Sequence, residues 1–274
     1  DQDAISNDFY IRTEGGVNIP QIVRDYADTV LKRNQIQADQ YFFQFLQFIL
    51  GIQQNPYRAG FPIWEHELEW MEKKSFRLGY IFFGNPNERS TTEPIQQFYM
   101  FFCPLFSDLD RNDGDDEVYF DFRNMSEAFK DRIYLLGAAK AKHSDASSDQ
   151  KPLFNTQIDE HQKKAIELFE KEFIDRVAVL YKGNETKLKN YQIPGEGSSK
   201  ESVFSAVASR VLNTHFTEKN PDYPAFKDLL TPNAKENFDG RIKSALRKLV
   251  YFTQPNRDGE AILSGLGLLG NQMI

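Results

Sequence analysis

The sequence predicts an α+β fold in which an aromatic-rich, mostly antiparallel sheet has flanking helices and is followed by a helical C-terminal subdomain. The chain has 24 Phe and 12 Tyr residues, and such side chains bury large areas where a sheet packs under helices. Two runs, Phe76–Phe83 and Gln97–Phe102, have the aromatic composition of strands. Elsewhere, apolar residues recur every three or four positions, which is the period of a helix.

The N-terminal segment, residues 1–57, is predicted to be helical. Between residues 18 and 55 the apolar positions follow a helical period, and Pro56 is expected to end the run. We expect this helix to be buried on most sides.

Residues 58–194 are predicted to form the sheet domain. Beside the two aromatic strands we expect a third strand at Val118–Phe122 and a hairpin that starts at Val177–Tyr181 and turns at Gly183-Asn184. Helices are predicted around Ile63–Lys73, at Ser126–Lys142 and at Ile158–Asp175, with a flexible loop at Lys142–Leu153.

The stretch Pro194-Gly195-Glu196-Gly197-Ser198-Ser199 has the composition of a linker. Residues 195–274 are therefore predicted to form a separate helical subdomain. Val203, Val207 and Val211 would share one face of its first helix.

The composition is that of a globular domain, with 40% hydrophobic and 27% charged residues. The single cysteine, Cys103, excludes an internal disulfide and fits a reducing compartment, so we expect a cytoplasmic protein. No stretch has the roughly 20 apolar residues of a membrane-spanning helix, so no membrane association is expected. The chain begins at Asp1 and its first methionine is Met71, from which we expect a piece of a longer protein.

Three glycine or histidine patterns approach known motifs and depart from them at the residues that matter. Gly265–Gly270 has the spacing of a dinucleotide-binding loop, but no acidic residue follows about twenty positions later. Gly79 and Gly84 have P-loop spacing, but Asn85-Pro86 stands where Lys and Ser or Thr would bind phosphate and magnesium. His66-Glu67 begins like a zinc-protease helix, yet Trp70 replaces the second histidine.

The remaining candidates for chemistry are also incomplete. The acidic run Asp108–Glu117 lacks the Gly and Glu that a calcium loop needs at its sixth and twelfth positions, which are Asp113 and Tyr119. No Ser or Cys motif offers a nucleophile beside a base, and Cys103 is expected to be a buried structural thiol. The sequence therefore predicts no catalytic residue, no metal ligand and no cofactor in this chain.

One polar loop is a candidate contact for a phosphate or a partner domain, through Glu88, Arg89 and Ser90. The alternative is a sheet-edge loop in which Arg89 pairs with Glu88 or Glu93, and surface arginines are common enough to favour that interpretation.

A second candidate is a nucleic-acid contact in the last third of the chain. The net charge is −7, but residues 151–274 are slightly basic, and one helical stretch there gathers five cations. A solvated helix face is the more common meaning of such a cluster, and the balance is far from that of an autonomous DNA-binding domain. The five residues are Lys235, Arg241, Lys243, Arg247 and Lys248.

Several separated segments resemble, in the same order, the large PglY-type ATPases of phage growth limitation and BREX defence. The segments are Ile63–Trp70, Arg77–Thr91, Phe173–Leu188, Ser205–Ser209, His215-Phe216, Pro221–Phe226, Leu230-Thr231 and Gly259–Leu269. The resemblance covers most of the chain from about Phe61. It implies a parent protein that uses ATP and Mg²⁺ in a module before this region, and that acts with other defence proteins against phage DNA.

From these observations the chain is expected to be a non-catalytic module of such an ATPase, contacting other domains of the parent, oligomer partners, defence-system proteins or DNA. The alternative is a nucleic-acid-binding helical module. An autonomous hydrolase has only isolated carboxylates in its favour.

Overall fold

The computed structural model describes residues 18–52, 63–73, 75–84, 96–193, 195 and 198–219. The chain divides into two compact units, residues 1–215 and residues 216–274. All six strands and the helices α1 to α5 belong to the first unit, and α6 (Asn213–Lys219) contains the boundary between the units.

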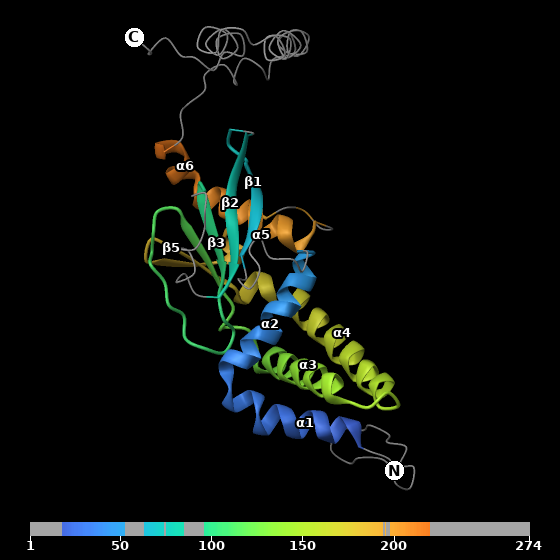
Figure 1. Ribbon diagram of the computed structural model, residues 1–274. Coiled ribbons are helices and arrows are strands. Elements are labelled where there is room, and N and C mark those ends of the chain that lie inside the picture. Colours follow the sequence, from blue (N-terminus) through green and yellow to red (C-terminus); the bar gives the residue numbers. More distant parts are fainter. Residues whose placement is uncertain are drawn as a thin grey trace, which may run out of the picture. The chain divides into compact units, whose positions relative to one another are not determined.

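In the described residues a single six-stranded sheet has its strands side by side in chain order (Figure 1). Three of the five pairings are antiparallel, namely β1–β2, β4–β5 and β5–β6, and the two pairings of β3, with β2 and with β4, are parallel. The predicted α+β class is confirmed, and the sheet is mixed. The strands are β1 (Ile63–Trp70), β2 (Ser75–Phe83), β3 (Phe98–Phe102), β4 (Glu117–Asp121), β5 (Ala178–Tyr181) and β6 (Asn184–Lys187).

Aromatic side chains stack in ladders across the parallel centre, one on each face of the sheet. On one face the ring centroids of Phe82, Phe101 and Tyr119 follow each other at 4.7 and 4.8 Å. On the other face Phe83, Phe102 and Phe120 follow at 5.3 and 5.4 Å. This stacking explains the aromatic runs of the sequence.

The two faces are covered in different ways. On the face of Phe102 and Phe120, the ring of Phe204 in α5 (Lys200–Val211) approaches both, at 5.2 and 4.8 Å. On the opposite face, Leu109 packs against the buried cluster. Because β3 and β4 are parallel, residues 103–116 must return along the length of the sheet, and this acidic connection therefore also serves as a cover.

The helices on the face of Phe102 and Phe120 pack against each other through phenylalanine rings. Helix α2 (Gln35–Leu50) contacts α3 (Glu127–Asp145) and α4 (Lys151–Arg176) through Phe45, whose ring lies 5.7 Å from Phe129 and 5.9 Å from Phe169. Helix α1 (Ile19–Thr29) packs on α3 in a second cluster. Asn18, Asn34, Ser126 and Ser199 cap α1, α2, α3 and α5 with their side-chain oxygens.

Two predicted segments are corrected by the structure. Residues 63–70 form strand β1 instead of a helix, because Trp64, Leu68 and Trp70 are buried while Glu65 is exposed on the alternate side. This period of two outweighs the helix propensity of Glu and Leu. The loop predicted at Lys142–Leu153 shrinks to residues 146–150, since α3 continues to Asp145 and α4 begins at Lys151.

The N-terminal helical run is interrupted and ends earlier than predicted. Residues Leu31–Arg33 form a short 3-10 turn, and Asn34 then caps a new helix. That helix, α2, ends at Leu50 because Gly51 adopts a left-handed conformation, with φ 67°. The predicted hairpin is confirmed as β5–β6, and Lys182 and Gly183 supply its positive-φ turn.

Strands β1 and β2 extend past the rest of the sheet. Pairing with β3 starts at Gly79, so residues 67–70 and 75–78 pair only with each other among the described strands. We call these eight residues the hairpin arm, and Figure 1 shows it at the upper end of β1 and β2. None of the helices that the structure describes has the length and apolar character needed to cross a membrane.

Candidate functional site

Polar side chains on one face of α5 and the start of α6 form a row against strand β1. Glu201, Ser205, Ser209 and Asn213 lie four residues apart, which places them one above the other on a helix. On the strand side, His66 and Trp70 point toward this row. We call Glu201, Ser205, Ser209 and Asn213 together with His66 and Trp70 the polar seam.

Hydrogen bonds join the strand side of the polar seam to its helix side. The Trp70 Nε1–H donates to Asn213 Oδ1 at 2.6 Å, and the Met71 backbone N–H donates to Ser209 Oγ at 3.0 Å. His66 Nε2 and Ser205 Oγ are 2.9 Å apart. These bonds connect the arm and the residues at its two ends to α5 and to the start of α6. They stabilise the arm, since a two-stranded arm is only marginally stable alone.

The proton positions at His66 follow from the partners of Ser205. The Ser205 hydroxyl donates its single proton to Glu201 Oε1 at 2.8 Å. Ser205 Oγ can then only accept from His66, so the imidazole carries its proton on Nε2. The direction of donation is therefore from His66 to Ser205 to Glu201.

The charge of His66 depends on its burial and on two nearby carboxylates. Burial lowers the pKa of the imidazole below its usual value, and the charges of Glu201, whose Oε1 is 3.5 Å from Nε2, and of Glu67 act in the opposite direction. In this arrangement the Ser205 proton is directed to Glu201 and not to the imidazole.

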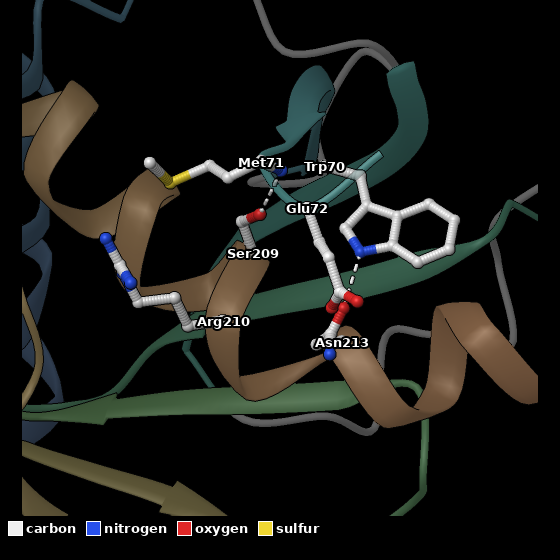
Figure 2. A pocket seen from close by; sticks show the side chains of 6 residues that line it. All are labelled: Trp70, Met71, Glu72, Ser209, Arg210 and Asn213. Carbon is white, nitrogen blue, oxygen red and sulfur yellow. Dashed lines mark hydrogen bonds between the residues drawn. The ribbon is translucent and has the colours of Figure 1, made fainter. Parts of the chain in front are cut away.

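A pocket of about 370 Å³ lies where the hairpin arm meets the end of α5 (Figure 2). In Figure 2, Met71 and Arg210 extend to one side of Ser209, and the Glu72 side chain lies on the other side and runs toward Asn213. The Arg210 Nε–H is buried and has no hydrogen-bond acceptor in the described part of the chain. The pocket thus combines an apolar wall with one cation and one exposed carboxylate. Its lining is Trp70, Met71, Glu72, Ser209, Arg210 and Asn213.

The histidine and glycine near-motifs of the sequence meet in one cross-strand row. His66 pairs with Gly79, and Gly79 pairs with Phe98. The imidazole and the Phe98 ring are 6.3 Å apart and perpendicular. A Cβ on Gly79 would be 2.5 Å from the Phe98 carbonyl oxygen. The glycine with P-loop spacing therefore lies within a strand and gives room to its neighbours.

The acidic connection is organised by internal hydrogen bonds. The buried Glu117 carboxylate accepts from the Gly114 N–H at 3.0 Å and from the Tyr119 hydroxyl at 2.8 Å. Burial raises the pKa of Tyr119 far above its usual value. Among the described residues no group of three or more His, Cys, Asp or Glu side chains is placed to hold a metal ion.

Two other buried polar groups, Asp39 and Cys103, have environments that explain their burial. Asp39 of α2 accepts from the backbone N–H groups of Leu105, Phe106 and Ser107 at 2.8 to 3.0 Å and from the Ser107 hydroxyl at 2.6 Å. Cys103 is fully buried, and this burial raises the pKa of its thiol well above the usual value.

Both candidate contacts from the sequence lie outside the described residues. This applies to Glu88, Arg89 and Ser90, to the basic set Lys235, Arg241, Lys243, Arg247 and Lys248, and to the glycine pattern at residues 265–270. The polar seam was missed because His66 and Ser205 are 139 residues apart. The four-residue spacing of Glu201, Ser205 and Ser209 was the available signal.

The fold and the site define an α+β domain in which the polar seam connects strand β1 to α5, the helix that ends shortly before the first compact unit does. The chain belongs to the DUF6079 third domain family, whose model matches residues 22–220. No curated protein and no solved structure matches the chain.

Proposed function

We propose that the chain is a non-catalytic module of a large bacterial anti-phage ATPase of the PglY type, and that it mediates contacts with partners, contacts between oligomer subunits or DNA-linked contacts. The observation that carries the proposal is the polar seam. His66, Ser205 and Glu201 are the residue types of a hydrolytic site. Here, however, Ser205 donates to Glu201 and accepts from His66, and the contact attaches α5 to β1.

Family membership supports the view that this domain works within a larger protein. The family is described as a third domain, a description that fits a protein with several domains. The resemblance of the segments Ile63–Trp70 and Arg77–Thr91 to PglY-type ATPases supports the particular parent. ATP and Mg²⁺ would then bind in another module, and the cytoplasm is the proposed compartment.

Attachment of α5 to the sheet gives this module a mechanical role. The polar seam ends at Asn213, two residues before the boundary between the compact units at residue 215. A displacement of the hairpin arm would therefore be transmitted to the chain that leaves the first unit. We propose that the module relates partner contacts to the position of neighbouring domains in this way.

Calorimetric titration of the chain with ATP and Mg²⁺ tests the non-catalytic assignment. We expect no saturable heat. Tight, saturable binding would overturn the proposal, and replacement of Gly79 or Ser205 by alanine would then show whether the binding uses the glycine with P-loop spacing or the polar seam.

The second candidate function is nucleic-acid binding, and it is favoured by the five cations between Lys235 and Lys248. Duplex DNA binding that weakens with salt and is lost when Arg241, Lys243 and Arg247 become Glu would support it. An absence of binding at low salt would refute it.

A further inference from the structure

The hairpin arm exposes two large apolar side chains on the face that points away from α5. Phe76 is 61% exposed and Leu78 is 50% exposed. They are two residues apart on β2 and therefore share one face of the sheet. Their cross-strand neighbours on β1 are Glu69 and Glu67, and Glu65 follows on the same face. All three glutamates are exposed.

Protection of a sheet edge explains only part of this pattern. Charged side chains on an edge strand prevent unwanted strand pairing, which accounts for the glutamates of β1. It does not account for Phe76 and Leu78, because along the arm β2 is paired only with β1 among the described strands, and exposed apolar side chains there would favour association instead of preventing it. Neighbouring exposed apolar side chains bordered by charge are typical of a contact surface.

We propose that this face docks a basic segment from another domain of the same polypeptide. An apolar residue of that segment would cover Phe76 and Leu78, and Lys or Arg residues would pair with Glu65 and Glu67. The proposal rests on the proposed function, since it names the surface and the partner chemistry of the contact module.

The size and charge of the face decide between the sources of such a segment. Covering half of a Phe and half of a Leu contributes less than the association of two free molecules costs. A segment in the same chain has a high effective concentration and avoids much of that cost. A second copy would bring two rows of glutamates together, and nucleic acid would meet like charge.

Accessibility of one position tests the docking directly. Leu78→Cys is made in the longer polypeptide that carries this domain, and its reaction with a maleimide is followed by peptide mass spectrometry. Leu153→Cys is the matched control, because Leu153 on α4 is 52% exposed. Both positions are exposed enough to accept Cys, and the native Cys103 is buried.

We expect Leu78→Cys to react roughly tenfold more slowly than Leu153→Cys. This is the result if a tethered segment covers the face in about nine of ten molecules. The difference should be independent of protein concentration. It should disappear near ~1 M NaCl, where the screening length is about 3 Å, and in a Glu65→Lys, Glu67→Lys background. Glu185→Lys on β6 is the control for charge reversal, and it should change nothing.

Three results would overturn the inference. Equal rates at the two cysteines would mean that nothing covers the face. Protection that grows with protein concentration, or with an added extract, would assign it to a second copy or a separate protein. Protection that survives both salt and charge reversal would exclude a basic segment. ATP binding by the chain would instead refute the proposed function, and it would leave these labelling results unchanged.

Discussion

Replacing Gly79 by alanine tests whether this glycine is needed for packing within the sheet. A Cβ at this position would lie 2.5 Å from the backbone carbonyl oxygen of Phe98 and 2.6 Å from two atoms of its ring. The carbonyl belongs to the neighbouring strand and cannot move without disturbing the ladder. Overpacking of this kind costs about 1–3 kcal/mol, and the smaller entropy of the unfolded alanine chain returns about 0.4–1 kcal/mol. We expect a net loss of about 1 kcal/mol.

Urea unfolding followed by tryptophan fluorescence measures this loss, because Trp64 and Trp70 both lie on the adjacent strand β1. Gly195→Ala is the matched control, since a Cβ there would meet no atom within 4 Å, and we expect its stability to be unchanged or slightly increased. Phe98→Leu removes the ring contacts but keeps the carbonyl contact. The two substitutions at Gly79 and Phe98 should therefore be non-additive by roughly 1 kcal/mol.

A Gly79→Ala variant as stable as the parent chain would refute the packing role of this glycine. If the variant kept its stability but lost binding of a nucleotide that the parent chain bound, Gly79 would have the role of a phosphate-loop glycine after all.

Two further predictions concern buried polar groups. Asp39→Asn should destabilise the chain by about 2–4 kcal/mol in urea unfolding. An amide has one acceptor oxygen for the bonds that two carboxylate oxygens accept, and its NH₂ would face the donors of Ser107. A loss below about 0.5 kcal/mol would contradict the assigned role. Burial, together with the nearby Arg132, lowers the pKa of His161 to about 4, from an ordinary value of 6.5. Between these values the unfolded chain binds the proton and the folded chain does not, so stability falls as the pH falls from about 6.5 to 4, by about 3 kcal/mol at most. His161→Gln should remove this part of the pH dependence, and identical pH profiles for the variant and the parent chain would refute it.

The sheet could be predicted where composition and period agree. At Phe76–Phe83 and Gln97–Phe102 nearly every residue is aromatic or apolar, and strands β2 and β3 lie there. The prediction failed at β1 because glutamate and leucine are good helix formers, and a window of eight residues with alternating acids satisfies both patterns in part. The decisive fact is tertiary, since α5 covers one side of the strand and leaves the other exposed.

The parallel centre of the sheet was also beyond the sequence signals. Parallel neighbours are usually joined through a helix, whereas β3 and β4 are joined by the acidic residues 103–116 without one. Nothing local distinguishes such a connection from a long hairpin loop. Its return path becomes intelligible only when Leu109 is seen on the far face and Glu117 is seen to accept from Gly114 and Tyr119.

The polar seam shows why residue types alone misjudge this site in both directions. A search for motifs discards His66 because the second zinc ligand is absent, and a search for triads would accept His66, Ser205 and Glu201 once the chain is folded. The direction of each hydrogen bond decides between these interpretations. Because Ser205 donates to Glu201 and accepts from His66, replacing Ser205 by alanine should loosen α5 from β1. Hydrogen exchange in the hairpin arm should then become faster, and unchanged protection of residues 67–70 would mean that the contact between His66 and Ser205 does not hold the arm.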